Sequence, residues 1–339
     1  MDIKLDFDDV LLVQQISELS SRKEVDLKVK YKFRYSEQVW SGIPIIATNL
    51  ATVGTINMAK TLKKYKMMTW LHKFHDWDVK ENHENIISNN YIVPTIGLDR
   101  NALNKVMKFN PKFLNIDVAH GGMQKYIDFI KYVRGLYPSL TIIAGTVSTP
   151  ETTLALINAG GSIIRLGVGS GGHCTTRDVG VGYPIFSNIL ETSKIAHNLG
   201  AHVICDGGIR KPGDAAKAFA AGADFISIGS MFAAHDENTD VNEIIEKDGV
   251  KCAPVYGMSS EYAMKKFYGK VDAHRTTEGK VSLIPMRGKI SKTLRHLLGG
   301  IRSACTYTNS KNIKNLEGKE WIRVNNQRNT YYEQYRVGD

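Results

Sequence analysis

The sequence has few of the residues that stabilise extracellular or membrane proteins. It contains four cysteines in 339 residues, Cys174, Cys205, Cys252 and Cys305, and their scattered positions do not suggest a disulfide framework. No apolar run reaches the roughly 18 residues that a membrane-spanning helix needs. The N-terminal MDIKLDFDD lacks the basic and apolar regions of a signal peptide. These absences predict a cytoplasmic protein with reduced thiols and no membrane partner.

Signatures of metal centres and nucleic-acid binding are also missing. The histidines are dispersed, and His72 and His75 have no further ligands at a tetrahedral spacing. There is no Walker motif, no nucleophile elbow and no long block of like charges. The formal net charge of +10 suits anionic ligands such as nucleotides, although evenly spread lysines are also typical of a solvated surface. We therefore expect no nucleic-acid partner.

Short apolar runs rich in β-branched residues recur along the chain and alternate with amphipathic segments. Strands are predicted at Ile43–Thr48, Met67–Trp70, Ile92–Ile96, Phe113–Val118, Thr141–Val147, Ser162–Val168, His202–Asp206 and Phe225–Ile228. Helices are predicted at Ile56–Tyr65, Gln124–Leu136, Pro150–Ala159, Pro184–Leu199 and Pro212–Ala221. Near-continuous apolar strands are typical of a parallel sheet buried on both faces. This pattern predicts an α/β fold, a (β/α)8 TIM barrel, as one domain over residues 1–339.

Two regions interrupt the regular alternation. The insertion at about 169–183 separates the sixth and seventh strands, and long insertions in compact barrels are usually functional. A second irregular region at about 271–292 follows the eighth strand, and we expect it to form a short mobile flap. A tail at 325–339 ends the chain, and no linker or second domain is evident.

Glycine and polar residues gather where several predicted strands end. Barrel enzymes place their active sites at this edge, often with a phosphate site after the seventh and eighth strands. Gly207, Gly208, Gly229 and Ser230 predict such a phosphate cradle, with ordinary turn glycines as the alternative. The GVGSGG segment matches a dinucleotide-binding pattern, but no helix follows it as that motif requires.

Cys174 occupies the glycine-rich insertion, between His173 and Arg177. A lone cysteine is more often a small buried hydrophobic residue. However, a position at the predicted barrel mouth favours a reactive thiol, because nearby cations favour the thiolate. Cys205, Cys252 and Cys305 have no comparable setting and are interpreted as structural.

Several motifs, in order and approximate spacing from about residue 4 to residue 324, resemble the IMP dehydrogenase/GMP reductase family. They are LDFDDVLL, SRKEVDL, GVGSGGHCTTRDVGVGYP, DGG, PGDAAKAFAAGADF, YGMSS, EGK and GGIRSACTY. Within the family the chain is similar to the reductases. It has no room for the regulatory CBS module that the dehydrogenases usually insert, and its flap EGKVSLIPMRGKI lacks their water-activating Arg-Tyr pair. The resemblance implies NADPH-dependent conversion of GMP to IMP and ammonia.

The resemblance also implies the catalytic roles. The Cys174 thiolate would attack C2 of the purine, which splits one difficult displacement into two easier steps. Thr176 and Glu278 would supply the proton that the leaving amine needs. Without the resemblance, Glu278 would be interpreted as an ordinary solvated carboxylate.

Binding roles are implied in the same way. The nucleotide would contact Asp206, Gly207, Gly208, Gly229, Ser230, Gly257, Met258, Ser259, Arg275, Thr276, Thr277 and Gly279. NADPH would contact Ser21, Arg22, Lys73, Asp117, Val118, Ala119, Met258, His274, Arg275, Ser303, Ala304, Cys305 and Thr306. Ser21 and Arg22 would reach it from a neighbouring subunit of a homotetramer or larger assembly, and arginine suits its 2′-phosphate. Gly169, Gly171, Cys174 and Arg177 would hold a monovalent cation such as K⁺.

The sequence departs from the family pattern at several of these places. Ala51 stands where the family has an aspartate, Gly172 replaces a phosphate-binding serine, Ser170 a proline and His120 an asparagine. The PTIGLDRN segment lacks the usual cofactor-binding serines and threonines. An IMP dehydrogenase and a nucleotide-binding barrel without turnover remain alternatives. In a flavin-dependent barrel the Cys-Thr-Thr loop would have no role.

Overall fold

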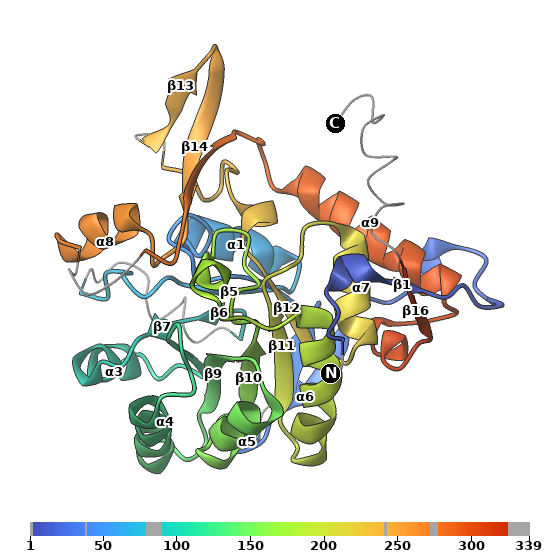
Figure 1. Ribbon diagram of the computed structural model, residues 1–339, viewed down its shortest axis with the longest axis horizontal. Coiled ribbons are helices and arrows are strands. Elements are labelled where there is room, and N and C mark those ends of the chain that lie inside the picture. The colour runs from blue at the N-terminus through green and yellow to red at the C-terminus, as the bar shows by residue number, and fades with distance from the viewer. Residues whose placement is uncertain (1–2, 38, 79–89, 241–242, 272–276, 325–339) are drawn as a thin grey trace.

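The computed structural model describes residues 3–37, 39–78, 90–240, 243–271 and 277–324. A parallel sheet occupies its centre and helices surround it (Figure 1). The strands follow the order β6, β5, β4, β12, β11, β10, β9, β8, β7. β6 (Ile92–Val93) and β7 (Thr95–Ile96) are halves of one strand, split at Pro94, which has no amide hydrogen. The nine segments therefore make eight strands that close on themselves, and the expected (β/α)8 barrel is confirmed.

Every barrel strand lies within a predicted range. The remaining seven are β4 (Ile45–Ala47), β5 (Met68–Trp70), β8 (Phe113–Asp117), β9 (Thr141–Val147), β10 (Ile163–Leu166), β11 (His202–Asp206) and β12 (Phe225–Ile228). All residues of β4, β5, β10 and β12 are buried, as a sheet covered on both faces requires.

The predicted helices are present with ends shifted by at most one residue. They are α1 (Ile56–Lys64), α4 (Gln124–Leu136), α5 (Pro150–Asn158), α6 (Ile185–Asn198) and α7 (Pro212–Ala220). The structure adds α3 (Arg100–Met107), α8 (Glu261–Tyr268) and α9 (Ser291–Tyr307), which the sequence pattern did not predict. The Gly299-Gly300 pair weakens the helical signal of α9. Gly300 has a packing role, because a Cβ there would lie 2.2 Å from Pro212 Cβ at the start of α7.

Short elements complete the described chain. β1 (Val10–Leu12) pairs antiparallel with β16 (Trp321–Arg323), and β2 (Val29–Lys32) pairs with β3 (Val39–Gly42). Five 3₁₀ turns among the described residues are η1 (Phe7–Asp9), η2 (Arg22–Glu24), η3 (Thr176–Val179), η4 (Ser230–Phe232) and η6 (Ile313–Leu316). None of the described helices is both long and apolar enough to cross a membrane.

The expected flap is partly an ordered strand. β13 (Ile245–Lys247), β14 (Val250–Tyr256) and β15 (Val281–Pro285) form an antiparallel sheet, of which β13 and β14 project beyond the barrel (Figure 1). Exposed and half-buried residues alternate along β15, which gives it a strand period. The description of 271–292 as irregular is therefore corrected for 281–285 and for 291–292, which begin α9. Residues 272–276 and the tail 325–339 lie outside the described residues.

Candidate active site

Two loops that are distant in sequence are joined by backbone contacts at the mouth of the barrel. The first carries Cys174 after β10, and the second is the part of the flap just before β15. Cys174 pairs with Gly279 in an isolated antiparallel bridge. The amide of Thr175 donates to the Glu278 carbonyl at 3.1 Å, and that of Lys280 donates to the His173 carbonyl at 3.1 Å. These bonds hold Glu278 beside the cysteine loop.

The three predicted catalytic residues form a chain of contacts. Cys174 Sγ lies 3.0 Å from Thr176 Oγ1, which donates to Glu278 Oε2 at 3.0 Å. A threonine hydroxyl has a single hydrogen. When that hydrogen points to the Glu278 carboxylate, the Cys174 thiol donates its own hydrogen to the hydroxyl oxygen. When the sulfur is a thiolate, the hydroxyl turns to donate to it and a protonated Glu278 donates to the hydroxyl. The geometry thus suits proton transfer between thiol and carboxylate.

The two cation-forming neighbours of Cys174 are engaged elsewhere. The Arg177 guanidinium pairs with Asp6 at 3.0 Å, and His173 Nδ1 lies 3.1 Å from Ser230 Oγ. Burial and the nearby Lys280 charge lower the pKa of His173, so its imidazole is neutral at pH 7. The sequence argument for cationic activation of the thiol is therefore not supported by these contacts. The groups that adjoin the thiol are instead the Thr176 hydroxyl and, beyond it, the Glu278 carboxylate, and we call Cys174, Thr176 and Glu278 the relay.

Predicted nucleotide-binding glycines lie where other segments approach the cysteine loop. Gly207, at φ +103°, has no room for a side chain, since a Cβ would lie 2.8 Å from Gly171 N. A Cβ on Gly257 would lie 2.7 Å from the His173 carbonyl oxygen. The segments after β11 and β14 therefore converge on the same loop, as the prediction requires.

The predicted phosphate cradle lies against the same loop. Gly229 precedes η4, which begins at Ser230. Gly172 faces this serine, because a Cβ on Gly172 would lie 3.0 Å from Ser230 Oγ. His173 Nε2 is buried and has no hydrogen-bond partner among the described residues. The His173 ring thus lies beside Ser230 of the predicted phosphate cradle.

Arg165 joins two predicted site residues and was missed by the sequence analysis. From β10 its guanidinium binds Asp117 Oδ1 of β8 and Asp206 Oδ2 of β11, each at 2.6 Å. It also lies 4.9 Å from the ring of Trp70, whose strand is on the opposite side of the barrel. Arg165 therefore points into the barrel interior. The available signal was a single charged residue inside the apolar run Ser162–Val168.

This cluster is strongly electrostatic. The Arg165 side chain is 5% exposed, and those of Asp117 and Asp206 are 16% and 15% exposed. Burial opposes ionisation of Asp117, but the charges of Arg165 and Lys73 outweigh it and hold the pKa of Asp117 below its ordinary value. Burial likewise opposes the charge on Arg165, and the two aspartates raise its pKa. Lys73 and Asp117, both predicted to contact NADPH, thus lie near one another.

Other predicted residues lie at the same mouth. The Ala51 amide donates to Met258 Sδ at 3.4 Å, so the position of the missing family aspartate adjoins a predicted ligand contact. Thr277 accepts a hydrogen bond from Thr175 at 3.3 Å through its carbonyl. Gly208, Ser259, Val118 and Ala119 are exposed or half-buried. His274, Arg275 and Thr276 lie outside the described residues.

A second group of predicted cofactor residues lies on α9, which packs on α7 in the outer layer. Arg22 Nε donates to Ser303 Oγ at 2.6 Å, and Ser21 caps the turn that carries Arg22. Thr306 Oγ1 donates to the Ser303 carbonyl at 2.8 Å. Cys305 follows Ala304 in α9 and packs fully buried in the core. This burial raises the pKa of its thiol to about 12. The predicted NADPH contacts therefore form two groups, one at the barrel mouth and one on α9.

The predicted monovalent-cation site consists of backbone carbonyls in the cysteine loop. The Gly171 carbonyl accepts from the Cys174 amide and the Arg177 carbonyl from the Gly180 amide, both at 3.0 Å. Each of these oxygens has a second lone pair, so these hydrogen bonds leave it able to accept a further partner. Within the described ranges, no three histidine, cysteine or acidic side chains gather as a metal site.

Known proteins are similar in sequence to this chain along almost its whole length. A sequence model of the IMP dehydrogenase / GMP reductase domain matches residues 4–330. The GMP reductase of Ascaris suum is 43% identical over 346 residues, which cover 98% of this chain and 97% of that protein. GMP reductase 2 of Homo sapiens is 44% identical over 340 residues, with 98% and 97% covered. The chain belongs to the IMP dehydrogenase/GMP reductase family.

Proposed function

We propose that this protein is a GMP reductase that uses NADPH to convert GMP to IMP and ammonia. The observation that carries the proposal is the continuous contact from Cys174 through Thr176 to Glu278, with both steps at 3.0 Å. Family membership and relatives named GMP reductase support the choice of substrate. A nucleophile, a hydroxyl and a carboxylate in hydrogen-bonding sequence suit the displacement of an amine that must leave protonated.

The residues account for each bond change. The Cys174 thiolate attacks C2 of GMP, and its proton passes through Thr176 to Glu278. Glu278 returns a proton through Thr176 to the 2-amino group. The C2–N bond then breaks and ammonia departs, so the purine remains bound to the Cys174 sulfur as a thioimidate. NADPH supplies the hydride that reduces C2. The C2–S bond then breaks, IMP is released, and the electron pair returns to Cys174 as thiolate.

Binding of the nucleotide would use the convergence around the cysteine loop. Arg165 fixes Asp206 through Oδ2, and we propose that Oδ1 accepts from a ribose hydroxyl. The phosphate would meet the backbone of Gly207, Gly208 and Gly229 together with the Ser230 hydroxyl. Flap residues next to Glu278 would enclose the base.

NADPH binding would require both groups of predicted contacts. Lys73 and Asp117 at the barrel mouth would contact its reactive half, and Arg22 with Ser303 suits a phosphate. Because Arg22 and Ser303 lie on the outer layer, they would serve the site of a neighbouring subunit in a homotetramer or larger assembly. K⁺ would bind the carbonyls of the cysteine loop and stabilise its conformation. Four free cysteines suit a reducing cytoplasm.

The test is NADPH oxidation by the purified protein in the presence of GMP, with IMP and ammonia measured as products. Cys174→Ala should abolish turnover but keep GMP binding by calorimetry. Cys252→Ala is the matched control, because Cys252 is a buried thiol of β14 and should leave activity intact. Formation of NADH from IMP and NAD⁺ without GMP reduction would instead identify a dehydrogenase. Binding of GMP with no turnover in either direction would identify a barrel that has lost catalysis.

A further inference from the structure

The N-terminal segment 4–9 crosses the outside of the barrel and is fixed to two helices. The Leu5 amide donates to Ser187 Oγ at 2.8 Å, and the Ser187 amide donates to the Leu5 carbonyl at 3.1 Å, which ties the segment to α6. Lys217 of α7 donates to the Phe7 carbonyl at 2.9 Å. The segment therefore offers a rigid support for the side chains that it presents.

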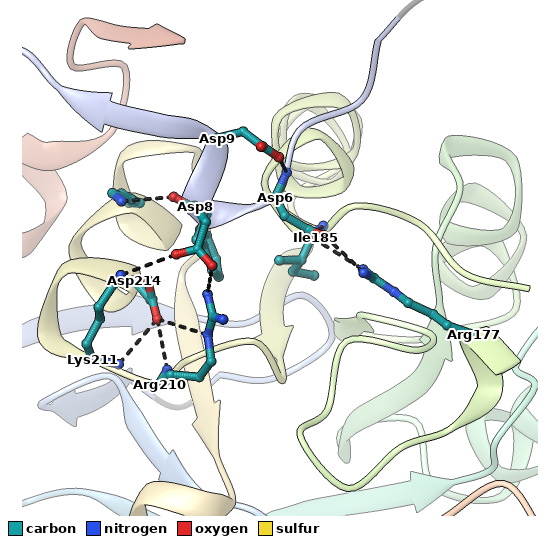
Figure 2. A network of polar contacts seen from close by, with 10 residues as sticks. Asp6, Asp8, Asp9, Arg177, Ile185, Arg210, Lys211 and Asp214 are labelled. Carbon is teal, nitrogen blue, oxygen red and sulfur yellow. Dashed lines mark hydrogen bonds and ion pairs between the residues drawn. The ribbon is translucent and has the colours of Figure 1, made fainter. Parts of the chain in front are cut away.

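From this segment the Asp6 side chain reaches Arg177 of the cysteine loop (Figure 2). Asp6 Oδ2 accepts from Arg177 Nη1 at 3.0 Å, and Asp6 Oδ1 accepts from Nη2 at 3.4 Å. Oδ1 also accepts from the Ile185 amide at 2.7 Å. The N-cap residue of α6 is Pro184, whose side chain makes no capping bond, so Asp6 acts as a cap from outside the helix. One carboxylate thus joins the loop to the helix that follows it.

Arg177 is itself packed between the two ends of the loop. A Cβ on Gly169 or on Gly182 would lie 3.0 Å from Arg177 Cγ. The stem of the side chain therefore lies against the backbone where the loop leaves β10 and where it approaches α6, although the side chain is 46% exposed. Arg177 directly follows Thr176, and both residues belong to η3.

We propose that Asp6 is a positioning residue for the catalytic loop: by fixing Arg177 it holds Thr176 between Cys174 and Glu278. The inference rests on the proposed function for its kinetic readout, whereas the reactivity of the thiol tests it independently. Two charge-assisted bonds to one guanidinium restrict orientation as well as distance. A small displacement of a reacting group is sufficient to slow catalysis strongly.

Asp8 provides a matched control within the same segment. Its carboxylate binds Arg210 and Lys211 at the start of α7, where both backbone amides also donate to Asp214 (Figure 2). The Asp8 side chain is 36% exposed and that of Asp6 33% exposed. Asp8→Asn therefore removes the same charge from the same segment at similar exposure, without touching the cysteine loop.

The experiment compares Asp6→Asn with Asp8→Asn in the full-length protein. Asparagine at position 6 still accepts from the Ile185 amide, so the variant weakens the arginine pairing selectively. We expect kcat to fall about tenfold in Asp6→Asn, with the KM for GMP within about twofold. The alkylation rate of Cys174 by iodoacetamide, followed by peptide mass spectrometry, should change about threefold or more. Asp8→Asn should leave both quantities near their wild-type values.

A double-mutant cycle with Arg177→Gln completes the test. If Asp6 acts through Arg177, the double variant should be no slower than Arg177→Gln alone. Additive losses, equal losses in the Asp6 and Asp8 variants, or an unchanged kcat with lowered Tm in Asp6→Asn would overturn the proposal. Asp6→Glu should recover part of kcat. A wild-type protein that does not reduce GMP would refute the proposed function, but the alkylation comparison would still decide the role of Asp6.

Discussion

The barrel mouth contains two polar clusters that are built differently. The first is the ion cluster of Arg165 with Asp117 and Asp206, whose members come from strands and are at most 16% exposed. The second is the relay of Cys174, Thr176 and Glu278, whose members come from loops, are half-buried and are joined by single hydrogen bonds. The ion cluster is fixed by the barrel, whereas the relay is fixed by backbone bonds between two loops.

The difference indicates a division of roles. An unpaired charge inside the barrel costs much free energy, so the ion cluster should dominate stability and hold in place the two carboxylates that we propose bind ligands. The relay contributes few contacts to the fold, but in the proposed mechanism it contains the groups that transfer protons and form and break covalent bonds. Substitutions should therefore separate the two clusters, and the following predictions are ordered by expected size.

The largest effect is expected for the nucleophile. Cys174→Ser keeps a hydroxyl in contact with Thr176 but replaces the thiolate by a poor nucleophile, so kcat should fall by about 10⁴-fold or more. The free energy of unfolding should change by less than about 1 kcal/mol, since the residue is half-buried in a loop. Steady-state kinetics and urea denaturation measure the two quantities. A large loss of stability with retained activity would reverse the assignment of roles.

The second prediction concerns the ion cluster. Arg165→Met should lower the free energy of unfolding by about 3–5 kcal/mol, because it leaves two buried carboxylates without their cation. The matched control is Arg177→Met, since Arg177 also pairs with an aspartate but is 46% exposed. Arg177→Met should lower the free energy of unfolding by about 1 kcal/mol or less. Urea unfolding followed by circular dichroism compares the variants, and equal losses would contradict the comparison.

The third prediction separates the relay from its scaffold. Thr176→Val preserves shape but removes the hydroxyl, and kcat should fall by about 10²–10³-fold. Glu278→Gln should show a loss of the same order, and the double variant should lose little more, because either change breaks the same relay. Independent, multiplying losses would show that the two residues act separately. The free energies of unfolding of Thr176→Val and Glu278→Gln should remain close to the wild-type value.

The smallest effect is expected at the opposite end of the barrel. His197 binds Asp224 at 2.9 Å and Glu317 at 3.3 Å, and these hydrogen bonds raise the pKa of His197 from 6.5 to about 10. A raised pKa stabilises the fold fully below pH 6.5, and this stabilisation is lost as the pH rises towards 10. We expect the free energy of unfolding, measured in urea, to fall by about 2 kcal/mol as the pH rises through this range. In His197→Asn the slope should disappear, and an unchanged slope would assign it to another group.

The fold was predictable because its strands are short, apolar and rich in β-branched residues. Such a pattern can be recognised from each segment of the sequence alone. α9 was missed because its glycines weaken the helical signal, whereas packing against α7 decides its conformation. The motifs singled out Cys174, Thr176 and Glu278, which the structure brings into contact, but they did not reveal the backbone bonds that hold the two loops together.

The roles of Arg165 and Asp6 were not predictable from the sequence alone. Arg165 meets carboxylates 48 and 41 positions away, and Asp6 meets its partners 171 and 179 positions away. Only the closed barrel brings these groups together. In contrast, NADPH, K⁺ and the assembly state stay predictions that binding and sedimentation experiments would decide.

The most direct test of the account is to mix the protein with IMP and NADP⁺, quench in acid and measure the mass of the Cys174 peptide. The reverse reaction should place a purine nucleotide on Cys174 and release a stoichiometric amount of NADPH before any amine is added. We expect this adduct in the wild type and in Cys252→Ala, and its loss in Cys174→Ala. Turnover of GMP without an adduct on Cys174, or an adduct on another residue, would contradict the central claim.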